Sequence, residues 1–351
     1  MAREAVTAWA WPGPIRLRPC ADGLINRTYW VEDGETHPIA VLQQLNTSIF
    51  GPEVHEDIAA VTSRLREKGV STPELLRTRS GNLYHAATDA SIWRALTVVG
   101  NRTIHRIAQR REAFSAGRLV ARFHGALDGF SWRFRSLRGN VHDTTAHMDG
   151  LRAALAVHTG HRLHGEVARV ADRILGAWNR GFPPLRGPTR LIHGDLKISN
   201  VRFQDQEAAA LIDLDTLQYG LWAVEMGDAM RSWCNPAAED TDAPRFDLSL
   251  FEAALTGYAA GCSPTFQPTD DEWGSLVPGL ERICWELAAR FARDALEECY
   301  FGFDPAHGGR GEHNLLRARG QAALATQVGT HRGEAERIVA SVRAGLVRSS
   351  S

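Results

Sequence analysis

Two segments of the chain combine residue types whose spacing could do chemistry. Residues 193–200 read His-Gly-Asp-Leu-Lys-Ile-Ser-Asn, and residues 212–215 read Ile-Asp-Leu-Asp. A His-Gly-Asp triplet alone is typical of a turn, and Ile-Asp-Leu-Asp alone is typical of a strand end with a capping carboxylate. In this order, however, the two segments supply carboxylates, an amide and an ammonium group. Phosphoryl transfer requires this set of groups.

Four residues of these segments have a predicted role in phosphoryl transfer. We predict that Asp195 accepts the proton of the attacking hydroxyl, because a positioned carboxylate is a suitable general base. Asn200 and Asp213 offer side-chain oxygens, which are the ligands that Mg²⁺ prefers. Lys197 is the predicted cation near the transferring phosphate. The chain has 40 Lys plus Arg residues but only two lysines, Lys68 and Lys197, so a lysine in this loop favours a functional role.

Apolar residues around the two segments predict the elements that position them. Three runs with strand character are separated by residues 193–200 and by a polar turn, and they lie at residues 191–192, 201–203 and 208–212. Antiparallel strands joined by a short turn return to their starting point. We therefore expect a hairpin that places Asp213 beside Asp195 and Asn200.

These residues resemble the signature of the aminoglycoside phosphotransferase and choline kinase superfamily, carried here by His193, Gly194, Asp195, Asn200, Asp213 and Asp215. Within it, the chain is most similar to N-acetylhexosamine 1-kinases. That narrower resemblance rests on segments spread over most of the chain, at residues 23–29, 41–46, 49–50, 93–94, 212–216, 227–231, 290–291, 300–301 and 313–315. It implies transfer of the γ-phosphoryl group of ATP, with Mg²⁺, to the anomeric hydroxyl of an N-acetylhexosamine or a hexose.

The resemblance and the residue pattern together predict an α+β protein with the bilobal fold of protein kinases. Residues 1–100 are the expected nucleotide-binding lobe, with strands from residue 15 and one main helix over residues 52–69. Residues 101–351 are the expected catalytic and substrate-binding lobe, which is larger and mostly helical. Its amphipathic helix candidates lie at residues 151–178, 247–260 and 276–295.

The first hairpin of the smaller lobe is the predicted cover of the nucleotide phosphates. Its turn at residues 22–26 contains Gly23 and Asn26 and could donate backbone N–H groups, although an ordinary turn is the alternative. The resemblance extends the nucleotide contacts to Thr28. Val98 begins the expected hinge, which offers backbone groups to adenine. No Gly-x-x-x-x-Gly-Lys loop occurs in the sequence, so a P-loop kinase is disfavoured.

The third strand of this lobe lacks the lysine that pairs with phosphates in protein kinases. It ends Val-Leu-Gln-Gln at residues 41–44, and Lys68 lies too far along the chain. N-acetylhexosamine 1-kinases resemble the chain here with a glutamine at the matching position, which implies that the Gln43 amide donates to phosphate. Glu56 occupies the place of the family's helix glutamate and could orient that amide. The alternative for Glu56 is an exposed helix carboxylate.

Residues near the C-terminus are the predicted acceptor contacts. The resemblance carries substrate contacts onto Arg290 and Tyr300 in particular. Arg290 and Asp294 are spaced to share a helix face, so they could also form a simple ion pair. Tyr300 and His313 add polar groups that suit recognition of a neutral polyol. Asp215 is assigned to the substrate side as well.

Two alternative functions remain open from the sequence. An acidic loop with Glu239, Asp240 and Asp242 could attract a cation, which favours an aminoglycoside, choline or an amino alcohol as acceptor. A catalytically silent nucleotide-binding protein is the other alternative, because the third-strand lysine is missing.

Composition favours a cytoplasmic enzyme. A net charge of -1 argues against a nucleic-acid partner, and no apolar run reaches the length of a membrane span. The N-terminus lacks the apolar region of a signal peptide. Five scattered cysteines indicate reduced thiols. We expect a monomer or homodimer whose partner is a small-molecule sugar, with neither nucleic acid nor membrane.

Overall fold

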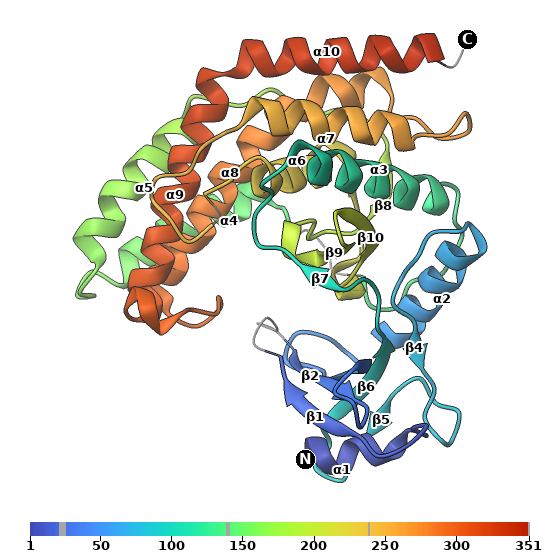
Figure 1. Ribbon diagram of the computed structural model, residues 1–351. Helices are drawn as coiled ribbons and strands as arrows, with labels where there is room; N and C mark the ends of the chain where they lie inside the picture. Colours follow the sequence, from blue (N-terminus) through green and yellow to red (C-terminus); the bar gives the residue numbers. More distant parts are fainter. Residues whose placement is uncertain (21–25, 138–140, 238, 350–351) are drawn as a thin grey trace.

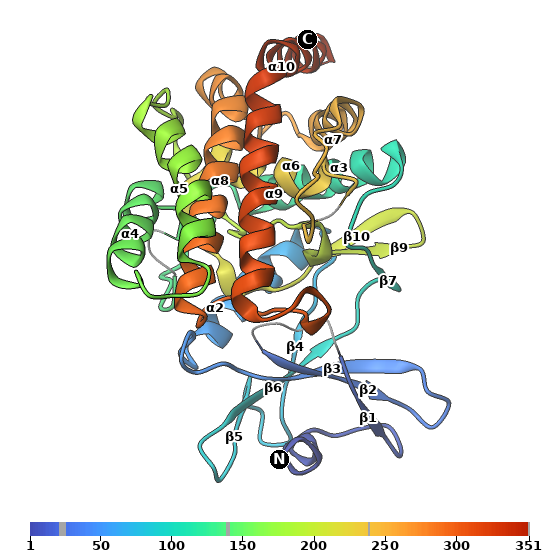
Figure 2. The same cartoon turned by 90° about the vertical axis from the view of Figure 1, so that its left-hand side faces the viewer.

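The computed structural model describes residues 1–20, 26–137, 141–237 and 239–349. Figures 1 and 2 show a sheet-rich N-terminal part at one end and a helical C-terminal part at the other. The predicted α+β fold class is thereby confirmed. Among the described helices, none combines the length and the apolar character that a bilayer crossing requires.

Six antiparallel strands form the N-terminal sheet in the order β1-β2-β3-β6-β4, with β5 paired to β6. Their bounds are β1 Arg16–Pro19, β2 Arg27–Glu32, β3 Pro38–Gln44, β4 Leu75–Leu76, β5 His85–Ala86 and β6 Ile92–Thr97. Trp9, Leu42 and Trp93 are buried in a small core between this sheet and the N-terminal turns α1 Ala2–Ala5 and η1 Val6–Ala8. The expected hairpin-rich beginning of the chain is confirmed.

The one long helix of this part is α2, Val54–Glu67. It ends where the backbone turns left-handed at Gly69, as the sequence predicts. Its apolar face, with Ile58, Val61 and Leu65, belongs to the large core of the C-terminal part. The helix therefore connects the sheet to the helical part of the molecule.

Eight helices build the described C-terminal part, and they are α3 Arg110–Leu127, α4 Thr144–Val157, α5 His164–Asn179, α6 Trp222–Trp233, α7 Leu248–Gly261, α8 Asp270–Glu297, α9 Arg310–Thr330 and α10 Arg332–Ser349. The expectation of one helix over residues 151–178 is wrong. A polar turn that contains Gly160 separates α4 from α5, since glycine is a poor helix former and the apolar periodicity stops there.

Glycines allow the closest helix contacts. A Cβ atom at Gly257 of α7 would lie 1.9 Å from the carbonyl oxygen of Phe114 in α3. A Cβ atom at Gly117 of α3 would lie 2.0 Å from the carbonyl oxygen of Ala254 in α7. The two helices can therefore pack only with glycine at both positions.

The central strands have the predicted order of strand, loop, strand, turn, strand. They are β8 Thr189–Ile192, β9 Val201–Gln204, β10 Glu207–Leu211 and β11 Gln218–Leu221. β9 pairs with β10 and with β7 Arg102–Thr103, whereas β8 pairs with β11. Short 3₁₀ turns, η2 Ile198–Asn200 and η3 Leu214–Thr216, hold the two acidic segments.

Candidate active site

The β9–β10 hairpin brings the two acidic segments together. The N–H of Ile212 donates to the carbonyl of Asn200 at 2.9 Å. The ring Nε2 of His193 lies 2.8 Å from the carbonyl of Ile212. Asp213 follows in the left-handed region, with φ 66° and ψ 49°, a conformation that Asp adopts more readily than most residues. The hairpin prediction is confirmed.

A buried glutamate on α6 fixes the start of the first segment. Glu225 accepts the N–H of His193 at 2.8 Å and that of Gly194 at 2.9 Å. Burial acts to raise the pKa of Glu225, but the hydrogen bond from His124 and nearby charges outweigh burial and lower it. Gly194 has φ 82°, and a Cβ atom there would lie 2.3 Å from the carbonyl of Thr216. No local sequence pattern indicates the role of Glu225, since its partners are distant in the chain.

Asp195 has one carboxylate oxygen held by the protein. Its Oδ2 accepts from Nζ of Lys197 at 2.6 Å and from Nδ2 of Asn200 at 3.0 Å. No hydrogen bond among the described residues involves Oδ1, and 23% of the side chain is exposed. Burial acts to raise the pKa of Asp195, but the positive charge of Lys197 outweighs burial and lowers it. An ionised carboxylate with an open oxygen can accept a hydroxyl proton.

Asp213 and Asn200 provide oxygen ligands on the same side of the site. Asn200 lines the cavity, and because its Nδ2 donates to Asp195, its amide oxygen is the atom available as a ligand. Burial and the neighbouring charge of Asp215 raise the pKa of Asp213 to about 6. Buried carboxylates of like charge are stabilised by a bound cation. The donor set therefore fits Mg²⁺.

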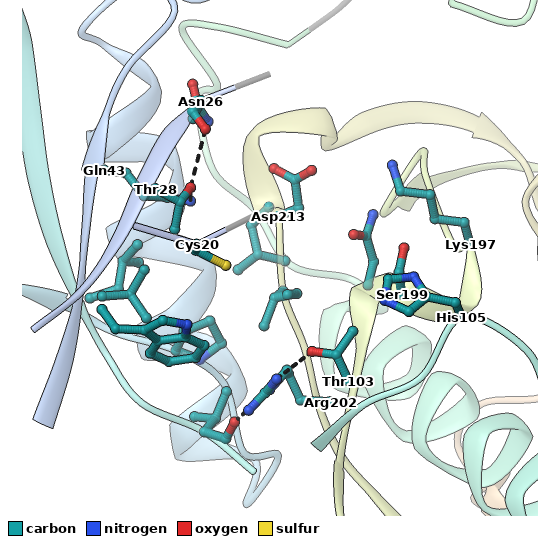
Figure 3. Close-up of a pocket in the computed structure, with 18 of the residues that line it drawn as sticks. Cys20, Asn26, Thr28, Gln43, Thr103, His105, Lys197, Ser199, Arg202 and Asp213 are labelled. Atoms are coloured by element: carbon teal, nitrogen blue, oxygen red, sulfur yellow. Dashed lines mark hydrogen bonds between the residues drawn. The ribbon is translucent and has the colours of Figure 1, made fainter. Parts of the chain in front are cut away.

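A cavity of about 610 Å³ lies between the two parts of the molecule and is lined by Lys197, Asn200 and Asp213. Asp195 contacts two of these residues, Lys197 and Asn200. Such a volume is typical of a small-molecule site. In Figure 3, Asp213 lies between Thr28 and Gln43 on one side and Lys197 on the other. Trp30 also lines the cavity, and the guanidinium of Arg202 stacks on its ring at 5.7 Å.

At the predicted hinge, the backbone is hydrogen-bonded to a side chain of β9. Arg202 donates to the carbonyls of Val99 and Gly100, each at 3.1 Å, and to the hydroxyl of Thr103. Val98 lines the cavity, at the place predicted for the hinge. Its backbone is therefore held near the apolar end of the site.

The other predicted nucleotide contacts have different surroundings. Gly23 lies outside the described residues. Asn26 is buried and donates to Asp215 at 3.1 Å, whereas Thr28 accepts from Nε2 of Gln43 at 3.2 Å. Glu56 is not beside Gln43. It forms an ion pair with Arg135 at 2.5 Å and is 45% exposed, which matches the surface alternative.

Asp215 lies in a buried ion pair that joins the two parts of the molecule. Its two oxygens accept from Nη1 and Nη2 of Arg94 on β6, at 2.6 and 2.5 Å. Nε of Arg94 donates to Oε1 of Gln43 at 2.9 Å. Burial acts to raise the pKa of Asp215, but the charge of Arg94 lowers it. The structure thus turns Asp215 toward the N-terminal sheet rather than toward an acceptor.

Two of the predicted acceptor residues hold the loop after α8. Asp294 is buried and accepts the N–H groups of Cys299, Tyr300 and Phe301. The ring of His313 accepts the N–H of Asp304 at Nδ1, and its Nε2 lies 2.8 Å from Asp240. Burial lowers the pKa of His313. Both side chains therefore use their polar atoms within the protein.

Tyr300 is exposed, whereas only 14% of the Arg290 side chain is exposed. Arg290 lies 3.9 Å from Glu286, and its guanidinium is 6.0 Å from the centre of the Tyr300 ring, which is itself 51% exposed. Neither residue belongs to the described lining of the cavity. On the C-terminal side the cavity is lined instead by Asp240 from the segment between α6 and α7, by Phe303, Asp304 and Pro305 from the segment before α9, and by Arg317 of α9.

Two of the three carboxylates of the acidic loop have basic partners. Glu239 contacts Arg231 at 2.7 Å, and Asp240 contacts Arg317 at 2.6 Å as well as the His313 ring. Arg231 also donates to Asp228 of α6. No ion pair among the described residues involves Asp242, so part of the negative charge of this loop is balanced and part is not.

Comparison with known proteins agrees with the geometry. Residues 16–261 match the model of the phosphotransferase enzyme family. A homoserine kinase from Methylobacillus flagellatus is 24% identical over 325 residues, which cover 90% of this chain and 92% of that protein. The relatives named here include no N-acetylhexosamine kinase, so the narrower resemblance stays a prediction.

Two solved structures share the fold. An aminopropanol kinase associated with a microcompartment has a TM-score of 0.63 at 18% identity and covers 95% of this chain and 98% of its own. An amicoumacin kinase in complex with AMP-PNP, Ca²⁺ and Ami has a TM-score of 0.62 at 14% identity, with 93% and 92% covered. The chain therefore belongs to the phosphotransferase enzyme family, and it transfers phosphoryl groups to hydroxyl groups of small molecules.

Proposed function

We propose that the chain is an ATP- and Mg²⁺-dependent kinase that phosphorylates the anomeric hydroxyl of an N-acetylhexosamine or a hexose. The observation that carries the kinase assignment is Asp195, whose Oδ2 contacts Lys197 and Asn200, two residues that line the cavity together with Asp213, and whose Oδ1 has no hydrogen bond among the described residues. Residues 1–100 form the nucleotide-binding lobe of this proposal, and residues 101–351 form the catalytic lobe.

Each residue has a defined part in the reaction. Asp195 orients the acceptor hydroxyl and takes its proton, and Lys197 keeps that carboxylate ionised and oriented. Asn200 and Asp213 would hold Mg²⁺, which when bound would offset the negative charge of the phosphates. The attacking oxygen then takes the γ-phosphoryl group in line, and ADP leaves. These intact groups argue against a catalytically silent protein.

The neutral acceptor is supported by the charge of the acceptor side. Glu239 and Asp240 each have a basic partner, which weakens the attraction of the loop for a cationic acceptor. Tyr300 supplies an exposed aromatic ring beside the Arg290 guanidinium, a combination that suits sugar hydroxyls and an acetamido group.

An amino alcohol or amino acid with a hydroxyl is the second candidate. Asp304 lines the cavity and could contact an ammonium group. The homoserine kinase and the aminopropanol kinase to which this chain is similar act, by their names, on acceptors of that kind.

A screen of ADP release separates the two candidates. Wild-type protein with ATP and Mg²⁺ should turn over N-acetylhexosamines or hexoses, and the matching methyl glycosides, whose anomeric oxygen is blocked, should give no product. Phosphorus NMR should place the new phosphate on C1. Turnover confined to homoserine, aminopropanol, choline or aminoglycosides would overturn the sugar assignment in favour of the second candidate.

A further inference from the structure

The N-terminal wall of the cavity contains a cation that the third strand lacks. Arg94 on β6 lies directly opposite Gln43 of β3 in the strand register. Its side chain is buried and lines the cavity. Among the described basic residues of that lining, Arg94 is the one that comes from the six-stranded sheet.

The guanidinium of Arg94 is held in one orientation. Nε donates to Gln43, and one N–H of each terminal nitrogen donates to Asp215. Because each terminal nitrogen carries a second N–H, two donors remain uncommitted to these partners. A planar guanidinium binds phosphate oxygens well through such donors, and it keeps its charge when buried.

The other cations of the cavity are held elsewhere by the protein. Lys197 is bound to Asp195 of the catalytic segment. Arg202 donates to the hinge carbonyls, and Arg317 is bound to Asp240 and to the carbonyl of Gly302. A cation that faces the phosphates from the sheet side must therefore come from Arg94.

We propose that Arg94 binds the phosphates of the nucleotide in place of the missing third-strand lysine, and that Gln43 and Asp215 position it. This inference rests on the ATP-dependent function proposed above. In protein kinases a carboxylate holds the phosphate-pairing lysine. Here Asp215 holds Arg94, and the cation has moved one strand along the sheet to the register partner of Gln43.

The test measures how the affinity of the protein for adenine nucleotides depends on the number of phosphate groups in the ligand. Calorimetry with Mg²⁺ would measure binding of adenosine, AMP, ADP and AMP-PNP to wild type and to Arg94→Gln. We expect Arg94→Gln to weaken ADP and AMP-PNP by about 10- to 100-fold, the usual effect of a lost hydrogen bond to a charged group, and adenosine by less than about twofold. A purely structural role would weaken all four ligands alike.

Two further variants distinguish a loss of phosphate binding from a loss of folding. The double variant Arg94→Gln, Asp215→Asn leaves no unpaired buried charge, so it should fold and show the same phosphate-dependent loss. Adding Gln43→Lys to Arg94→Gln places an ammonium group on the register partner and should restore at least about tenfold of the ADP affinity. The control is Arg66→Gln, which removes an exposed arginine paired with Glu74 in the same part of the chain and should change nothing.

The possible failures are distinguishable. If wild type binds ADP but the variants weaken adenosine and ADP equally, or weaken neither, the assignment of Arg94 is overturned and the kinase function stands. If wild type binds no nucleotide at all, the proposed function is overturned, and the role of Arg94 with it.

Discussion

At the scale of single residues, Asp195 is the group whose chemistry can be tested most directly. Asp195→Asn keeps the shape of the side chain but removes its ability to accept a proton. We expect turnover to fall by about 10²- to 10⁴-fold, as for loss of a general base, while AMP-PNP affinity changes little. ADP release and calorimetry measure the two quantities. Asp205→Asn, in the exposed turn of the same hairpin, is the matched control, and near-normal turnover of Asp195→Asn would contradict the assignment.

His55 predicts how stability depends on pH. It is buried on α2, where burial and then the charge of Arg94 lower its pKa from 6.5 to about 4. The His55 imidazole is therefore protonated below about pH 6.5 in the unfolded chain but only below about pH 4 in the folded protein. The free energy of unfolding should fall between pH 6.5 and pH 4 by about 3 kcal/mol from this group. Denaturant titrations at a series of pH values measure the free energy of unfolding of wild type and of His55→Gln. Between pH 6.5 and pH 4 this free energy should fall more steeply with decreasing pH in wild type, and equal pH dependence of the two proteins would disprove the contribution.

The types and spacing of residues in the sequence predicted the reacting groups, but they did not predict which residues contact and position those groups. Asp195, Asn200 and Asp213 lie in short segments whose spacing is characteristic. Arg94 and Asp215 are 121 residues apart, and Glu225 contacts residues 31 and 32 positions away, so no local pattern signals these contacts. Asp294 was predicted to contact the acceptor, but its carboxylate accepts backbone N–H groups of the loop after α8. The sequence alone does not show where such backbone groups lie.

At the scale of elements, the α3–α7 contact gives a stability prediction. Gly257→Ala would place a methyl group 1.9 Å from a backbone oxygen of α3, so the helices must separate. We expect a loss of about 1–3 kcal/mol, as for overpacking in a tight core. Gly176→Ala in α5 is the control, since nothing lies within 4 Å of its Cβ position, and it should stabilise the protein by up to about 1 kcal/mol. Thermal unfolding compares the two, and equal effects would contradict the packing argument.

Elements were predictable where the local pattern was strong. The central hairpin is signalled by apolar pairs that flank a polar turn, and its strands lie where expected. The break between α4 and α5 was missed, because both helices have similar apolar faces and only a short polar turn separates them. On α2, the prediction chose Glu56, whereas its neighbour Asp57 faces the protein, since adjacent helical residues point about 100° apart.

At the scale of the whole molecule, Asp57 ties α2 to the segment after α3. It is buried and accepts from the Trp132 indole, from the N–H groups of Arg135 and Ser136, and from the Ser136 hydroxyl. Asp57→Ala should lower the free energy of unfolding by about 2–4 kcal/mol, because several partly buried donors lose a charged, buried acceptor. Glu56→Gln, next to it but half exposed, should change it by less than about 1 kcal/mol. Urea unfolding measures the free energy of unfolding of both variants. A small change for Asp57→Ala would contradict the role of Asp57 in joining α2 to the segment after α3.

Arg202 has a consequence for the whole site. It lies two residues after Asn200 on β9, and its guanidinium fixes the carbonyls of Val99 and Gly100. In the proposed kinase, the backbone that would receive the base and the residue that would hold the metal are thus joined through one short strand. A shift of β9 would therefore move both ends of the nucleotide site together.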